Sequence, residues 1–248
     1  MPDVVMSASP RHADPAAVST ALRAAAEHGA FFVLDLPETG SPPGAAVLAD
    51  LYRAAGEFDL QELIDHYARR LRTSERRVAA SLLFQGFAAR LWSPVVGVAA
   101  AGLVPDLDPQ HLHWWRASPL GLRLDRLTGW NAADLARHAE LAAHTVVESN
   151  LRPLAGAVRR TVRIAEGLLW GNAASALVGA ARVVGTPTAR ALAVALLARE
   201  PLLGTTATVT TDDPLTIRRR SCCLYYRAPG GGLCGDCALS AVPPPSAG

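Results

Sequence analysis

Residues 167–181 read GLLWGNAASALVGAA, and residues 91–105 read LWSPVVGVAAAGLVP. They are the longest uncharged apolar stretches of the chain, with 15 residues each. A helix that spans a membrane needs about 20 apolar residues. Both stretches therefore predict helices buried in a protein core, and no membrane span is expected. The fold class expected around them is mainly α with a small β element, an α+β fold.

Helical patterns continue on both sides of these stretches. Asp14 and Ser74 are suitable N-caps for two of the helices, and Gly29 suits a helix end. Pro94 is expected to interrupt the helix that Ser74 begins. The expected helices cover residues 14–28, 44–55, 60–72, 74–92, 94–101, 131–149, 151–163, 165–184 and 187–199. The expected strands cover residues 31–36, two parts of 112–124 that turn at Ser118-Pro119, and residues 205–211.

Composition excludes several classes of protein. Half of the 248 residues are hydrophobic and 19% are charged, enough for a large core. The net charge of +2 does not favour a strongly basic nucleic-acid binder, and no nucleic-acid partner is expected. All 24 basic residues are arginine and 47 residues are alanine, a bias typical of G+C-rich bacterial genomes. The N-terminus lacks a cationic start followed by an apolar run, which predicts a cytoplasmic protein.

All four cysteines fall within sixteen residues, at Cys222, Cys223, Cys234 and Cys237. Such a cluster in a cytoplasmic chain is more typical of a metal site than of a disulfide staple. Zinc sites with four thiolates commonly use two C-x2-C knuckles, whereas the spacing here is C-C-x10-C-x2-C. Adjacent cysteines diverge along the backbone and suit a two-iron cluster. No histidine follows His144, which excludes a Rieske centre. An all-cysteine [2Fe-2S] cluster is favoured, and structural zinc, disulfides or free thiols are the alternatives.

The cysteine segment resembles a known family. Residues 219–226, RRSCCLYY, and residues 229–239, PGGGLCGDCAL, are similar to the C-terminal signature of FhuF-type ferric siderophore reductases. Two upstream segments also fit that family, LWSPVVG at residues 91–97 and LWGNAASAL at residues 169–177. The resemblance covers about residues 55–240 and implies a helical FhuF-like domain (55–211) followed by a [2Fe-2S]-binding segment (212–240). An N-terminal helix and strand portion (1–54), which matches nothing in the family, precedes them, and the tail (241–248) is expected to be disordered.

The resemblance also implies an activity. The family reduces Fe(III)-siderophores by one electron and releases Fe(II), with all four cysteines as cluster ligands and no further catalytic residue. The expected partners are a ferric siderophore, such as a hydroxamate, and an external electron donor, such as a ferredoxin or flavin reductase. The chain contains neither a P-loop nor a G-x-G-x-x-G motif, so it is not expected to bind ATP or NAD(P).

Two other functions remain open at the level of the sequence. The first is a non-enzymatic helical module that binds a siderophore or partner and carries a structural four-cysteine zinc site. The second is an iron–sulfur sensor that acts on other proteins, which the absence of a helix-turn-helix or basic recognition surface disfavours.

Four arginines surround the cysteines: Arg218, Arg219, Arg220 and Arg227. They either position the segment, raise the cluster potential and offer a cationic surface, or form a solvated charge run partly balanced by Asp212 and Asp213. Arg220, nearest to the ligands in sequence, is the strongest functional candidate.

The aromatic residues and histidines are expected to be mainly structural. The five tryptophans are predicted to lie in the core, and Tyr225 or Tyr226 is expected to pack over the cluster. His111 and His113 share a strand face, but they make a poor metal site without a nearby carboxylate.

Overall fold

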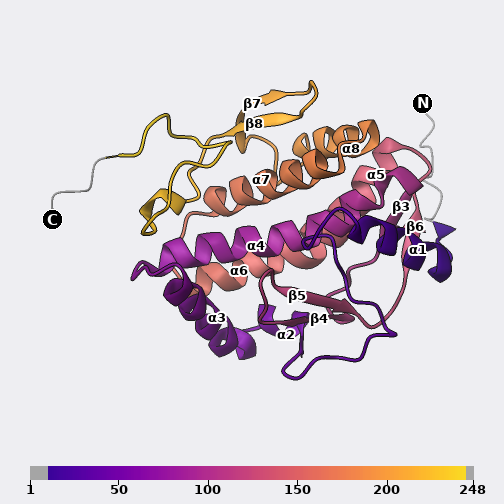
Figure 1. Ribbon diagram of the computed structural model, residues 1–248, viewed down its shortest axis with the longest axis horizontal. Helices are drawn as coiled ribbons and strands as arrows, with labels where there is room; N and C mark the ends of the chain where they lie inside the picture. Colours follow the sequence, from indigo (N-terminus) through magenta and orange to yellow (C-terminus); the bar gives the residue numbers. More distant parts are fainter. Residues whose placement is uncertain (1–10, 244–248) are drawn as a thin grey trace, which may run out of the picture.

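The computed structural model describes residues 11–243 (Figure 1), and the fold is mainly helical with small sheets, which confirms the predicted class. The α-helices are α1 (Pro15–Ala26), α2 (Leu48–Tyr52), α3 (Glu57–Arg70), α4 (Arg76–Gly97), α5 (Leu135–Ala142), α6 (Arg152–Thr161), α7 (Glu166–Val184) and α8 (Pro187–Leu197). Three 3-10 turns, η1 (Ala54–Gly56), η2 (Ala99–Ala101) and η4 (Tyr225–Arg227), and a π-helix, η3 (Ala143–Leu151), complete the helical elements described.

Helices α4 and α7 form the centre of the molecule and lie side by side (Figure 1). Helix α7 contains the apolar stretch 167–181, and α4 contains the first part of the stretch 91–105, which was predicted to form a core helix but continues as η2 and a short strand at Leu103–Pro105. Side chains of α4 such as Phe84, Phe87 and Trp92 are fully buried. Within residues 11–243, segments 76–101 and 166–184 are long and apolar enough to cross a membrane. However, 72% and 61% of their apolar windows are buried inside the fold. Most of the apolar surface of both segments is therefore covered by the rest of the fold.

Within the described residues, eight short strands form three small antiparallel sheets. The first sheet has the order β1 (Arg11–His12), β6 (Gly129–Asn131), β3 (Leu103–Pro105), and the second has the order β2 (Ala46–Val47), β4 (Leu112–Trp115), β5 (Gly121–Leu124). The third pairs β7 (Thr206–Thr210) with β8 (Thr216–Arg219). Strands β4, β5 and β7 were predicted, and β1, β2, β3 and β6 are too short for a periodic signal. Strand β8 is as long as β4 but falls within the C-terminal segment that was predicted to be irregular.

The predicted strand at residues 31–36 is wrong. Apart from one isolated bridge, at Asp35, this segment is turn and coil. Its carbonyl groups are occupied by the buried guanidinium of Arg90 on α4 instead of by a strand. Arg90 donates to the carbonyl oxygens of Ala30, Phe31 and Val33 at 3.0, 2.6 and 2.5 Å. A long-range side-chain contact thus replaces the sheet pairing that the local apolar pattern indicated.

Several helix boundaries also differ from the predictions. Pro94 does not interrupt α4, which begins at Arg76 and continues to Gly97 because it is packed between neighbouring helices. The segment 44–55 forms only the short α2 with flanking β2 and η1. The helix predicted over 131–149 begins later, because Asn131 belongs to β6 and Asp134 caps α5.

Helix α5 continues through η3 into α6 without the expected break. Asn150, fully buried within η3, donates to the carbonyl oxygens of Thr145 and Leu107, both at 2.8 Å, and accepts from the hydroxyl of Tyr52. These bonds occupy the side chain of Asn150 in the middle of the π-helix. The tail predicted to be disordered (241–248) lies outside the described residues from 244 onward.

Candidate metal centre

Residues 220–239 form an irregular segment that leaves the end of β8 and lies against the helical body (Figure 1). Its turns require unusual backbone conformations, with φ of +69° at Leu224 and +75° at Gly230. Gly231 has no room for a side chain, because a Cβ atom there would lie 2.0 Å from the carbonyl oxygen of Tyr225. The segment therefore folds back tightly and returns its second pair of cysteines to the first.

The four thiols are arranged as two pairs. The Sγ atoms of Cys223 and Cys234 are 3.7 Å apart, and the thiol of Cys237 lies close enough to Cys222 to add to the rise that burial causes in the pKa of Cys222. All four cysteines are free, and 3.7 Å is far beyond the ~2.05 Å of a disulfide bond. The two adjacent cysteines thus have different partners, as their divergence along the backbone predicts.

The two pairs have different surroundings. Cys223 is buried, at 3% exposure, and the other three cysteines are partly exposed. The sulfur of Cys222 accepts a bond from the backbone N–H of Leu224 at 3.3 Å, and that of Cys237 accepts one from Leu239 at 3.4 Å. The pair containing Cys223 instead faces a network of buried polar side chains.

Arg219 is the centre of this network. Its side chain is buried, and Nη2 lies 2.6 Å from the sulfur of Cys234 while Nη1 donates to Oδ1 of Asn172 at 2.8 Å. Nε forms an ion pair with Oδ2 of Asp236 at 3.0 Å, although the two are not aligned as a hydrogen bond. Burial lowers the pKa of Arg219, but the Asp236 carboxylate and the nearby thiols outweigh this effect, and the net shift is upward. The guanidinium is therefore charged.

Asn172 and Ser81 extend the network into the core. The Asn172 amide, on α7, donates to the carbonyl oxygen and the hydroxyl of Ser81 on α4, both at 2.9 Å. The Ser81 hydroxyl in turn donates to the carbonyl oxygen of Cys223 at 2.7 Å. Sequence reasoning missed both residues. The signal available for Asn172 was a lone amide within the apolar stretch 167–181.

Ionisation of the thiols is opposed in the metal-free protein. Burial raises the pKa of Cys234 to about 12, with Arg219 opposing this rise and Cys223 adding to it. Burial also raises the pKa of Cys222, and the neighbouring thiols contribute. Crowded thiolates repel one another. Bound metal cations offset this repulsion with their positive charge, so metal coordination deprotonates the thiols.

The donor set fits a [2Fe-2S] cluster held by all four cysteines. Such clusters take four thiolates, and the segment supplies four in two pairs. A single zinc ion requires four ligands that converge on one centre. The four cysteines lie close together in two pairs, an arrangement that agrees with a two-iron centre.

The other arginines of the segment have partners away from the thiols. Arg220, the strongest candidate from sequence, is exposed and donates from Nε to the carbonyl oxygen of Thr206 at 3.1 Å. Arg219, not Arg220, contacts a ligand. Asp213, expected to balance the charge run, instead pairs with Arg190 at 3.0 Å. The remaining two also lie at the surface, with Arg218 bonded to the carbonyl oxygen of Ala238 and Arg227 paired with Glu75.

The aromatic residues and histidines have structural surroundings for the most part. Three tryptophans are buried, Trp92, Trp114 and Trp170, and the other two are half-buried. His113, expected to lack a carboxylate, has Nε2 2.5 Å from Oδ2 of Asp125. Tyr225 is exposed and Tyr226 half-buried, and the packing of either over a cluster remains a prediction.

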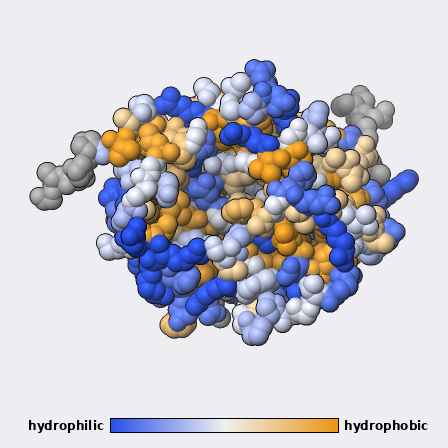
Figure 2. Space-filling view, viewed as in Figure 1, coloured by the Kyte–Doolittle hydropathy of each residue, from blue (hydrophilic) through white to orange (hydrophobic). Residues whose placement is uncertain are grey.

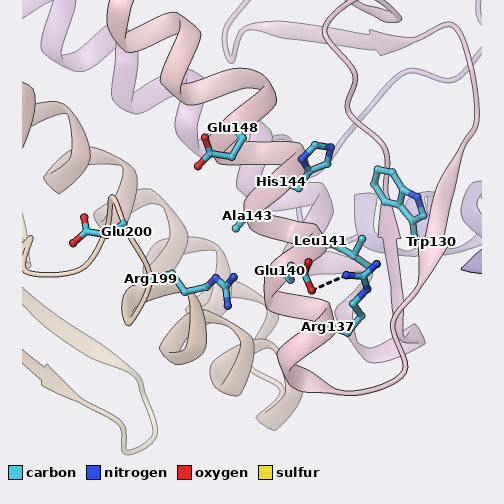
Figure 3. Close-up of a pocket in the computed structure, with 9 residues that line it drawn as sticks. All are labelled: Trp130, Arg137, Glu140, Leu141, Ala143, His144, Glu148, Arg199 and Glu200. Carbon is cyan, nitrogen blue, oxygen red and sulfur yellow. Dashed lines mark ion pairs between the residues drawn. The ribbon is translucent and has the colours of Figure 1, made fainter. Parts of the chain in front are cut away.

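Two cavities of the structure differ in their position relative to the cysteines. One of about 430 Å³ is formed by α5, η3 and the loop after α8, with none of the cysteines in its lining; Figure 3 shows the Arg137–Glu140 ion pair and His144 in it. The other, of about 290 Å³, lies directly beside the cysteine segment and is lined by Trp170, Arg220 and Ser221 among others.

Comparison with known families agrees with this site. Residues 219–239 match the FhuF 2Fe-2S C-terminal domain. The match contains all four cysteines together with Arg219 and Asp236, and it indicates a [2Fe-2S] cluster. It confirms the resemblance over these residues and supports a role in siderophore-related iron metabolism. A comparison with curated proteins found no match.

Proposed function

We propose that this protein is a cytoplasmic ferric-siderophore reductase that passes one electron to Fe(III) through a [2Fe-2S] cluster. The observation that carries the proposal is the pairwise arrangement of four free thiols in a segment that matches the FhuF 2Fe-2S C-terminal domain. The [2Fe-2S] cluster supplies one-electron transfer when it is bound.

One-electron reduction is sufficient to release iron from these chelates. Hydroxamate and catecholate oxygens hold Fe(III) far more tightly than Fe(II), so adding one electron makes the complex labile without breaking a bond in the chelator. For each iron, one electron enters from an external donor, such as a ferredoxin or flavin reductase, and one leaves to Fe(III). Fe(II) then leaves by ligand exchange. No general acid or base is required.

The surroundings of the cysteines support this exchange of electrons with partners. Cys222 and Cys237 are partly exposed, and Figure 2 shows hydrophobic residues gathered around the C-terminal segment, where Leu233 and Val242 are exposed. The cavity of about 290 Å³ beside Ser221 offers a place for one arm of a chelate. A ferric hydroxamate bound at this cavity approaches the partly exposed Cys222 and Cys237, whereas Cys223 is buried.

The test begins with protein purified without oxygen. We expect a red-brown sample with two irons per chain that gains an S = 1/2 EPR signal on reduction. Cys234→Ser is expected to abolish the signal, whereas Ser240→Ala, an exposed substitution in the same segment, is expected to preserve it. One equivalent of a ferric hydroxamate then reoxidises the reduced protein, and a chromogenic chelator traps one Fe(II).

Two results would overturn the proposal. A colourless protein with stoichiometric zinc after anaerobic handling would favour the binding module with a structural metal site. A reduced cluster that ferric hydroxamates and catecholates fail to reoxidise would retain the metal centre but refute the siderophore as substrate.

A further inference from the structure

The guanidinium of Arg219 connects strand β8, which carries it, to the Cys234–Cys237 turn and to helix α7. Its three nitrogens face a ligand sulfur (Cys234), the carboxylate of Asp236 and the amide of Asn172 on α7. Its backbone N–H also donates to the carbonyl oxygen of Asp236 at 3.0 Å. Arg219 thus holds the Cys234–Cys237 turn with both its main chain and its side chain.

Stability alone gives little reason for this arrangement. Burying a guanidinium is costly even when it is paired, and apolar replacements of buried ion pairs are often neutral or stabilising. Arg219 is 1% exposed, and its carboxylate partner Asp236 lies within the Cys234–Cys237 turn. The helical core buries many apolar side chains that do not depend on the Arg219–Asp236 ion pair. The ion pair therefore serves the cysteine turn more directly than it serves the core.

We propose that Arg219 is the positioning residue of the metal centre, which fixes the Cys234 thiolate against α7 and, with Asp236 as its counter-charge, sets the reduction potential. This inference concerns the [2Fe-2S] centre and holds whichever substrate receives the electron. Position in the sequence alone favours Arg220 for a role at the metal centre, because Arg220 is nearest to the ligands, whereas the contacts in the structure favour Arg219.

The charges of the two residues determine the sign of their effects. Reduction adds one negative charge to the centre, so a nearby positive charge stabilises the reduced state and raises the potential. An N–H donor to a ligand sulfur acts in the same direction. Removing the charge of Arg219 must therefore lower the potential, and removing the charge of Asp236 must raise it.

Opposite signs separate this role from a merely structural one. General loosening of the segment would expose the centre in both variants and would move both potentials in the same direction. Arg219→Gln keeps the backbone bond to Asp236, and Asp236→Asn keeps a similar shape. Arg218→Gln is the matched control, because it removes the same charge from the adjacent residue, whose side chain is exposed and whose bonding partner is the carbonyl oxygen of Ala238.

The experiment is an EPR-monitored redox titration of the anaerobically purified wild-type protein and its four variants, Arg219→Gln, Arg219→Lys, Asp236→Asn and Arg218→Gln, with iron and sulfide content measured in each. We expect a lower midpoint potential and altered g-values in Arg219→Gln, a higher potential in Asp236→Asn, and a much smaller shift in Arg218→Gln. Arg219→Lys should recover part of the potential, because it restores the charge without the planar guanidinium.

The proposal is overturned if Arg219→Gln shifts the potential no more than Arg218→Gln does, or if the Arg219 and Asp236 variants shift it in the same direction. Should Arg219→Gln not assemble a centre, Asp236→Asn decides the matter: an upward shift supports the proposal, and no shift or a downward shift refutes it.

Discussion

The link between the cysteine segment and the helical core can be tested at Asn172. Asn172→Leu preserves the side-chain volume approximately but removes one acceptor and two donors in a fully buried position. The lost bond from the charged Nη1 of Arg219, at 2.8 Å, is worth about 1.5–3 kcal/mol, and the lost bonds to Ser81 add about 0.5–1.5 kcal/mol. We therefore expect the free energy of unfolding to fall by about 2–4 kcal/mol.

A loss of this size leaves the protein folded, because domains are typically stable by about 5–15 kcal/mol. Urea unfolding followed by circular dichroism measures the loss, and the melting temperature should fall by roughly 4–16 °C for a chain of this length. The measurement is made on both metal-free and metal-loaded protein. The destabilisation should appear in both forms, because the Arg219 charge is buried whether or not metal is bound.

The matched control is Ser175→Ala on the same helix. Its hydroxyl accepts one bond from the Gln85 amide at 3.3 Å in a partly buried position, so its loss should cost less than about 1 kcal/mol. If Asn172→Leu costs no more than this control, then Asn172 does not support the buried guanidinium, and the assignment of the network to the stability of the segment is wrong.

Three further changes test other parts of the structure. Gly231→Ala should reduce the iron content strongly, because its Cβ would meet backbone carbonyl oxygens at 2.0 and 2.9 Å, whereas Gly232→Ala, with open space around it, should retain iron. Arg90→Met should lower the free energy of unfolding by about 4 kcal/mol in a urea titration, since four carbonyl groups lose a charged donor. The hydrogen bond from Arg227 lowers the pKa of Glu75, so its stabilisation is present above the unfolded-state pKa and is lost as the pH falls through the folded-state pKa. In metal-free protein, Arg227→Gln should therefore remove less than about 1 kcal/mol at pH 7 and progressively less as the pH falls through the folded-state pKa of Glu75, and a loss that does not decrease in acid would contradict this sign.

The sequence predicts the main features where the signal is local. The apolar stretch at residues 167–181 and the first half of the stretch at 91–105 do lie in the central helices, because continuous apolar surface has to be buried. The second half of the 91–105 stretch is also largely buried, but it forms η2 and β3 instead of a helix. The cysteine spacing indicates the metal segment for a similar reason, since cysteines separated by zero, ten and two intervening residues can reach one centre through short turns. Neither inference requires knowledge of distant contacts.

The features that were not predicted depend on contacts between distant residues. The segment 31–36 has a strand-like composition, but its carbonyl groups bond to Arg90, which is more than fifty residues away. Arg220 is adjacent in sequence to the cysteine region, yet it points outward because alternate residues of β8 and its extension face opposite sides, which places Arg219 inside. The role of Asn172 follows only from the packing of α7 against α4.

The metal segment has little core of its own, and this explains why its two thiol pairs differ. On the inner side, fixed groups from outside the segment contact Cys223 and Cys234: the hydroxyl of Ser81 on α4 holds the Cys223 backbone, and the guanidinium of Arg219 on β8, itself bonded to Asn172 on α7, lies beside the Cys234 sulfur. On the outer side, Cys222 and Cys237 receive only backbone N–H groups from their own segment. Under the proposed function, the inner pair tunes the potential through rigid charges, while the outer pair meets substrate and donor without disturbing those charges. The thermodynamics of the proposed electron transfer would then depend on Arg219 and its anchor in the helical body, and access for partners would depend on the segment itself.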